Sequence, residues 1–126
     1  ELIVLGASIR YGKYSPLVFK FVKNYKKILN KKKNAFFSVN VVARKTEKSL
    51  PETNPYIQKF LKKTNWVPKK IGVFAGKVDY PNYNFINKLA IRLIMYITKG
   101  PTDISKSYEF TNWDNIKKFA QELDNL

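Results

Sequence analysis

Three short runs rich in β-branched and aromatic residues constrain the fold of this chain most strongly. They lie at residues 2–5, 35–42 and 71–76, and turn-forming, small or polar residues follow each of them. The first run, Leu-Ile-Val-Leu, shows no alternation of apolar and polar residues. Such a run is typical of a strand that is buried on both faces of a parallel sheet. The sequence therefore predicts three strands of this kind.

Two amphipathic helices are predicted between the strands. Residues 14–30 carry apolar side chains at near-helical spacing, with lysines on the opposite side and Pro16 in the first turn. A second helix is predicted over residues 55–63, with Asn54 as its N-cap. Strands and helices that alternate in this way indicate an α/β fold, a parallel sheet covered by helices on both faces.

The chain begins with Glu1 and enters the first strand at once. A strand that is buried on both faces normally has a neighbour on each side, so we expect the sheet to be N-terminally incomplete. From this start we expect no signal peptide or transit segment.

Residues 77–101 break this alternation. An aromatic, turn-rich stretch at 78–85 is followed by an apolar helix at 86–97, far shorter than the ~20 residues that cross a bilayer. Projected as a helix, one face holds most of its apolar residues, while Ile91 and Met95 lie on the other side with Lys88, Arg92 and Lys99. Apolar groups on both sides leave some hydrophobic surface without a place in the core.

The last segment is predicted to close the fold. A short strand is possible at residues 107–110, and a final helix begins at Thr111, Asn112 or Asp114. The apolar residues of this helix recur at helical spacing, and they are Trp113, Ile116, Phe119, Ala120 and Leu123.

The charge and the missing residue types limit the chemistry. The net charge is +15, yet 21 of the 24 bases are lysines, whereas recognition of phosphates and bases favours arginine. Compositional drift and an anionic partner both remain open as explanations of the charge. Cysteine and histidine are absent, which excludes Cys/His zinc sites, thiol nucleophiles and imidazole bases. An enzyme of this composition must therefore borrow its chemistry from a cofactor.

Three loops follow the predicted strands at residues 6–12, 38–45 and 75–80. Ligands of parallel α/β sheets bind beyond the carboxyl ends of the strands, where these loops meet. A planar cofactor such as a flavin suits main-chain donors and acceptors beside one aromatic side chain. An ordinary tight turn explains the first loop equally well, and Tyr80, Pro81 and Tyr83 could form a packed loop.

Several strings in the sequence together resemble one known family. They include Ala-Ser-Ile-Arg-Tyr-Gly at 7–12 and Ser-Val-Asn-Val-Val-Ala-Arg-Lys at 38–45, with further matches around Trp66, at 80–83 and at 111–113. The family is the flavodoxin-type, quinone-dependent protoporphyrinogen dehydrogenases of haem biosynthesis, and the resemblance covers nearly the whole chain. It implies that residues 1–126 form a partial flavodoxin-like domain, a three-layer parallel sheet, with a helical insertion at about 77–101.

The resemblance also implies a cofactor and its site. It implies that FMN binds non-covalently and is the redox centre, so no catalytic side chain and no metal are expected. The cofactor-binding residues that it implies lie in the first two loops, and they are Ser8, Ile9, Arg10, Tyr11, Gly12, Ser38, Val39, Asn40, Val41 and Val42.

The same resemblance implies the partners. Protoporphyrinogen IX would be oxidised, and the electrons would pass to a membrane quinone, menaquinone or ubiquinone, at the cytoplasmic face of the bacterial inner membrane. The family's insertion is associated with the substrate and the membrane, and no nucleic acid is expected. We expect the surplus apolar surface of the helix, at Ile91 and Met95, to serve this role. The implied substrate or membrane residues are Tyr80, Tyr83, Lys88, Ile91, Arg92 and Met95.

One part of the family pattern has no match in this sequence. The family opens with a strand and a Ser/Thr-rich loop that binds the FMN phosphate at a helix N-terminus. We therefore expect this chain alone to bind FMN poorly. Two other functions remain as alternatives: a basic module that binds membranes or nucleic acid without catalysis, and a flavodoxin-like electron carrier.

Overall fold

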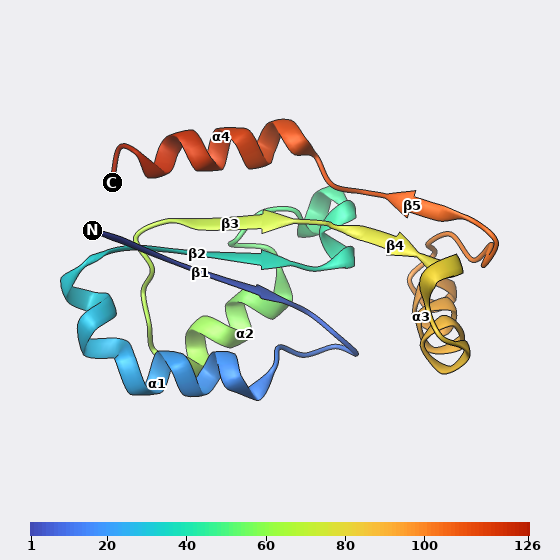
Figure 1. The fold of residues 1–126 in the computed structure, drawn as a ribbon, viewed down its shortest axis with the longest axis horizontal. Coiled ribbons are helices and arrows are strands. Elements are labelled where there is room, and N and C mark those ends of the chain that lie inside the picture. The colour runs from blue at the N-terminus through green and yellow to red at the C-terminus, as the bar shows by residue number, and fades with distance from the viewer.

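The computed structural model describes residues 1–126 and contains a parallel sheet with helices on both faces (Figure 1). Strands β1 (Leu2–Ser8), β2 (Lys33–Val39) and β3 (Ile71–Phe74) lie side by side in that order. Helices α1 (Pro16–Lys31) and α2 (Pro55–Thr64) cover one face, and α4 (Trp113–Leu123) covers the other. The predicted α/β fold is confirmed.

Local sequence signals account for the helix boundaries. The Ser15 hydroxyl accepts a hydrogen bond from the Leu17 N–H, and Pro16 occupies the first turn of α1. The Asn54 side chain accepts a hydrogen bond from the Ile57 N–H at the start of α2, and Asn112 caps α4 in the same way. The predicted helices at 14–30 and 55–63 therefore match α1 and α2 to within about two residues at each end.

The main core lies between the sheet and the α1–α2 layer. Phe36 of β2 stacks on Phe60 of α2, with ring centroids 4.7 Å apart, and Trp66 packs edge-on against both rings. A smaller cluster on the opposite face brings Phe119 of α4 against Ala35 and Phe74. These two clusters hold the carboxyl ends of the three strands in register, with Ser8 beside Val39 and Val39 beside Phe74.

Three strand predictions need correction. β2 ends at Val39, because the chain then turns into the 3-10 helices η1 (Val41–Arg44) and η2 (Thr46–Lys48). The stretch expected to be a loop at 43–53 is thus partly helical. β3 ends at Phe74 and not at residue 76, because Gly76 has a left-handed backbone with φ of 78°. β1 lies at the edge of the sheet, where Leu2 and Val4 are exposed.

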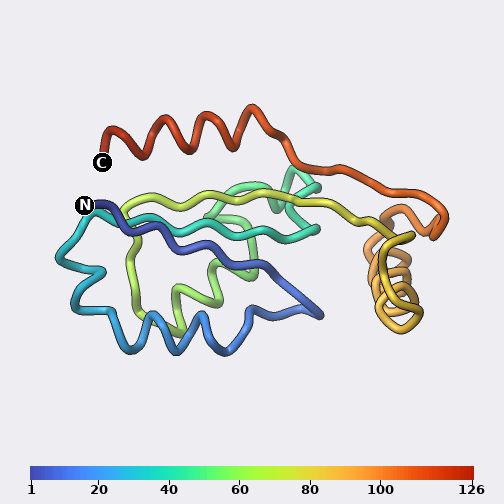
Figure 2. The backbone as a smooth tube through the Cα atoms, in the orientation of Figure 1, coloured from blue at the N-terminus to red at the C-terminus, as the bar shows by residue number.

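A two-stranded ribbon extends beyond the carboxyl end of the sheet. β4 (Lys77–Asp79) and β5 (Ser107–Glu109) pair antiparallel, with Val78 opposite Tyr108. Figure 2 shows that the chain leaves the sheet along β4, forms a helix at the far end and returns along β5 to α4. That helix is α3 (Phe85–Ile97), which confirms the helix predicted at 86–97, and the short η3 (Tyr80–Asn82) precedes it.

The orientation of α3 is the reverse of what we expected. Met95 is only 1% exposed and packs with Val78 and Tyr80, and Ile91 lies against the same cluster. The outer face of α3, defined as Phe85, Ile86, Leu89, Leu93, Tyr96 and Ile97, is exposed instead. The surplus apolar surface therefore belongs to this outer face and not to Ile91 and Met95. No helix of the structure has the length and apolar character needed to span a membrane.

Candidate functional site

A pocket of about 700 Å³ lies at the carboxyl ends of the three parallel strands. Its walls come from the loops that follow β1 and β2, from the segment that follows β3, and from α3. Most of the residues that line it are apolar, and polar residues of both loops line it as well. The volume lies in the range of small-molecule and cofactor sites in proteins.

The first wall is the loop after β1. All five residues predicted here, 8–12, line the pocket. The Ile9 N–H donates to the Val39 carbonyl oxygen at 2.9 Å, which ties this loop to the next one. Tyr11 and Gly12 both have positive φ, of 52° and 80°, so the loop makes a tight turn that a glycine accommodates without strain. The Arg10 guanidinium lies 5.8 Å from the centre of the Tyr11 ring.

The second wall is the loop after β2, and residues 39–42 line the pocket. The main-chain N–H groups of Tyr11, Gly12, Val41 and Val42 donate to no acceptor within the protein. Four unpaired donors on residues that line one pocket suit a planar ligand that has several acceptors along its edge. A flavin ring is such a ligand, so the residues present fit the ring of the cofactor that the sequence suggested, but not its phosphate.

Ser38 lies outside the pocket, below the second loop. It is fully buried, and its hydroxyl accepts hydrogen bonds from the Tyr14 hydroxyl at 2.6 Å and the Asn40 amide at 2.9 Å. The Asn54 amide donates in turn to the Asn40 side-chain oxygen at 2.9 Å. Burial raises the pKa of Tyr14 to about 12, although the hydrogen bond to Ser38 opposes this shift. The structure thus assigns Ser38 to the support of the loop.

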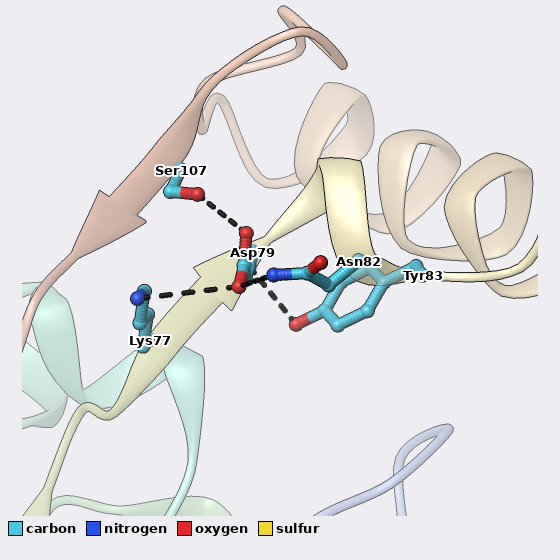
Figure 3. A network of polar contacts seen from close by, with 5 residues as sticks. All are labelled: Lys77, Asp79, Asn82, Tyr83 and Ser107. Atoms are coloured by element: carbon cyan, nitrogen blue, oxygen red, sulfur yellow. Dashed lines mark hydrogen bonds and ion pairs between the residues drawn. The ribbon is translucent and has the colours of Figure 1, made fainter.

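Tyr83 reaches the pocket from the end of the ribbon. Its hydroxyl oxygen accepts a hydrogen bond from the Asp79 N–H at 3.2 Å (Figure 3). The Asp79 carboxylate accepts hydrogen bonds from Ser107 and Asn82, each at 2.5 Å, which lower its pKa. This network holds β4, β5 and the start of α3 together, and it fixes the position of Tyr83. Tyr80, by contrast, is buried outside the pocket lining, and its hydroxyl donates to the Pro101 carbonyl oxygen.

The inner side of α3 forms the wall opposite the two loops. Ile91 and Met95, both predicted as substrate residues, line the pocket. Lys88 and Arg92 do not line it, and Arg92 is exposed. Sequence reasoning missed Asn87, Ile94 and Thr98, which also line the pocket; their spacing with Ile91 and Met95 was the available signal.

The pocket carries positive charge only. Arg10, Arg44 and Lys77 line it, whereas none of the nine acidic residues does. Arg44 lies within the predicted ligand loop at 38–45, but the cofactor residues predicted in that loop end at Val42. Arg44 is half-buried, and this desolvation lowers the pKa of its guanidinium.

Comparisons with known proteins give one consistent result. The sequence model of the flavodoxin domain family matches residues 1–105. A protein of Escherichia coli K12, named protoporphyrinogen IX dehydrogenase [quinone], is 44% identical over 126 residues, which is 100% of this chain and 70% of that protein. A protein of Leishmania major with the same name is 43% identical over 123 residues, 98% of this chain. The chain spans about half (53%) of the length of the Leishmania protein. No solved structure gives a significant match.

Proposed function

Because the chain belongs to the flavodoxin domain family, we propose that it forms the cofactor and substrate pocket of an FMN-dependent oxidoreductase. Its substrate in this proposal is protoporphyrinogen IX and its electron acceptor is a quinone, as the names of the two relatives suggest. The reaction belongs to haem biosynthesis and yields protoporphyrin IX.

One observation carries the proposal: a single pocket combines unpaired main-chain donors on one side with an apolar helix on the other. Tyr11, Gly12, Val41 and Val42 supply the donors, and Ile91 and Met95 belong to the helix wall. A flavin needs hydrogen-bond donors at one edge, and a tetrapyrrole needs a broad apolar surface. The pocket offers both within about 700 Å³.

The residues of the first two loops would hold the flavin. When bound, FMN would supply two-electron redox chemistry. Three such cycles, each reducing one quinone to its hydroquinone, account for the six electrons and six protons that protoporphyrinogen IX loses, so the chain needs no catalytic nucleophile. The absence of cysteine and histidine is compatible with this chemistry. The protein's own contribution is to bind and orient the two molecules, and to exclude water through the apolar residues of α3.

We further propose that α3 brings the enzyme to the membrane, where quinones reside. The outer face of α3 is a continuous apolar strip, and Ile86 and Ile97 at its two ends are 76% and 69% exposed. Lys88 and Arg92 on the same helix, and Lys99 directly after it, suit the anionic surface of a cytoplasmic leaflet. A short helix of this kind lies in the plane of the interface. The location proposed is therefore the cytoplasmic face of a bacterial inner membrane, with peripheral attachment.

An oxidation assay tests the proposed reaction. Protoporphyrinogen IX is incubated without oxygen with the protein, FMN and either menaquinone or ubiquinone, and the fluorescence of protoporphyrin IX is followed. We expect quinone-dependent formation of the porphyrin. Ile91→Glu places a carboxylate in the apolar wall, so we expect at least a tenfold lower kcat/KM.

Lys59→Gln is the control, because Lys59 is exposed on α2 and does not line the pocket. We expect this variant to keep the rate of the unaltered chain. If no porphyrin forms with menaquinone or with ubiquinone at saturating FMN, the proposed reaction is contradicted. Equal rates for the Ile91 variant and the control would contradict the assignment of the α3 wall.

A further inference from the structure

Arg44 joins the two walls of the pocket. Its Nη1 donates to the Val41 carbonyl oxygen at 3.1 Å, within the loop that follows β2. Its Nη2 donates to the carbonyl oxygen and the hydroxyl of Thr98, at 3.0 and 3.1 Å, at the end of α3. No other side-chain hydrogen bond or ion pair connects residues 1–75 with residues 77–110. A cation in this position also suits the negative end of the α3 helix dipole.

The remaining surroundings of Arg44 fix its position. The Phe110 ring lies under the guanidinium, 5.9 Å from centroid to Cζ. Gly100 approaches so closely that a Cβ there would lie 2.9 Å from Nη2 and 2.7 Å from Met95 Cε. The guanidinium is therefore held rigidly at the edge of the pocket, with little freedom to swing into water.

The charge of Arg44 has no partner within the protein. All three of its hydrogen-bond acceptors are neutral oxygens, and none of the four ion pairs involves it. Of the other two cations of the pocket, Lys77 has Asp79 at 4.0 Å, and Arg10 is exposed. Withdrawing a charge from water is unfavourable unless an opposite charge compensates. An anionic group of a ligand in the pocket would supply that charge.

Arg44 also keeps donors for such an anion. A guanidinium has five N–H groups, and the contacts to Val41 and Thr98 use three of them. Because the bonds to the protein set the orientation, little conformational entropy is lost when a ligand binds.

We propose that Arg44 binds a carboxylate of the substrate and makes the pocket selective for anionic tetrapyrroles. This inference rests on the proposed function and adds the residue that recognises the acidic side chains of the ring. In this role Arg44 is a specificity-determining residue. The apolar ring would lie against Ile91 and Ile94 of the α3 wall, and one propionate would reach Arg44.

A binding measurement tests this role without turnover. Protoporphyrin IX and its dimethyl ester share one ring, but only the free acid carries carboxylates. Each is titrated into the protein with FMN present, and binding is read from porphyrin fluorescence. We expect the unaltered chain to bind the free acid at least tenfold more tightly than the ester, and this preference to shrink as salt is added.

Three variants separate charge recognition from a structural role. Arg44→Gln should bind both porphyrins with nearly equal affinity, whereas Arg44→Lys should keep a preference of several fold. Lys45→Gln removes the same charge one residue away, outside the pocket lining, and should keep the full preference. If Arg44→Gln fails to fold, the lysine variant and the salt dependence of the unaltered chain still test the inference.

The outcomes that overturn the proposal are distinct. A preference that survives in Arg44→Gln, or is absent from the unaltered chain, overturns the role of Arg44 and leaves the proposed function standing. Failure of the unaltered chain to bind either porphyrin overturns the proposed function and this inference with it. Binding of FMN and riboflavin is compared in the same proteins. If the unaltered chain binds FMN more tightly than riboflavin and Arg44→Gln does not, the flavin phosphate lies at Arg44, and the inference is overturned as well.

Discussion

At the residue scale, buried polar side chains determine where the second loop lies. Tyr14, Ser38, Asn40 and Asn54 form a connected chain of hydrogen bonds below it, and all four are at most 4% exposed. A buried polar group costs free energy unless it is hydrogen-bonded, so the chain fits together in one arrangement. This arrangement ends β2 at Val39 and presents Val41 and Val42 to the pocket.

The buried hydroxyl of Tyr14 makes stability sensitive to alkaline pH. Its pKa is about 12 in the folded chain and near 10 when unfolded, so folding favours the protonated form. The stabilisation is complete below pH 10 and is lost as the pH rises towards 12. At most about 3 kcal/mol is lost, since one pKa unit is worth about 1.4 kcal/mol.

Urea unfolding between pH 8 and pH 12 checks this prediction. Tyr14→Phe removes the titrating group, so we expect its free energy of unfolding to fall less steeply above pH 10 than that of the unaltered chain. Lysines titrate in the same range in both proteins, and the difference between the curves isolates Tyr14. Parallel curves would contradict the prediction.

The sequence predicts correctly those site residues whose position follows from the path of the backbone alone. Residues 8–12 and 39–42 line the pocket because they follow parallel strands, which a sequence pattern reveals. Ser38 lies two residues after the buried Phe36 on β2, so strand alternation places its side chain on the same buried face. The resemblance to the family gave no sign of this and implied a cofactor contact instead. Arg44 is fixed by Thr98, 54 residues away, and no local pattern encodes a contact over that distance.

At the element scale, helix starts were more predictable than strand ends. A cap and a proline act within one turn, so Ser15, Pro16, Asn54 and Pro55 mark the starts of α1 and α2 in the sequence itself. The end of β2 depends instead on side chains from other elements. β4 and β5 have only three residues each, and their pairing joins Val78 to Tyr108 across all of α3.

The reversed orientation of α3 shows a limit of helical periodicity. The spacing of apolar residues reveals which side chains share a face, but not which face points inward. The smaller face, with Ile91 and Met95, points inward because Val78 of β4 and Tyr80 of η3 pack against Met95. The larger apolar face remains outside.

Two alanine substitutions test this orientation. Met95→Ala removes a buried side chain, so we expect a loss of about 2–4 kcal/mol in the free energy of unfolding. Leu93→Ala changes a side chain that is 59% exposed on the same helix, and we expect a change within about 0.5 kcal/mol. Urea unfolding, followed by far-UV circular dichroism, measures both. A larger loss for Leu93→Ala than for Met95→Ala would restore the orientation expected from the sequence.

At the scale of the whole molecule, charge and apolar surface are unevenly distributed. Residues 1–102 contain 21 of the 24 bases but only four of the nine acids. The four ion pairs engage only four lysines and no arginine, so most of the positive charge is free to meet an anionic partner. A nucleic acid and an anionic bilayer are both such partners, but the outer face of α3 adds an apolar strip that only the bilayer can bury.

Vesicle binding therefore distinguishes the two partners, and it tests the proposed attachment to a membrane. We expect the protein to sediment with vesicles of phosphatidylglycerol and phosphatidylcholine, and less with phosphatidylcholine alone, because basic residues near the strip gain from anionic headgroups. Ile97→Ser, on the outer face, should weaken the binding about tenfold, since burying an isoleucine side chain contributes about 1.5–3 kcal/mol.

Leu17→Ser is the matched control for that substitution. Leu17 lies on α1 and is 72% exposed, close to the 69% of Ile97, but it lies outside the outer face of α3. We expect this variant to bind vesicles as well as the unaltered chain, because the proposed attachment uses the outer face of α3 and not α1. Equal weakening by both substitutions would show that exposed apolar residues act without regard to position. RNA binding with a steep salt dependence, together with weak vesicle binding, would instead favour a nucleic-acid partner for the basic surface.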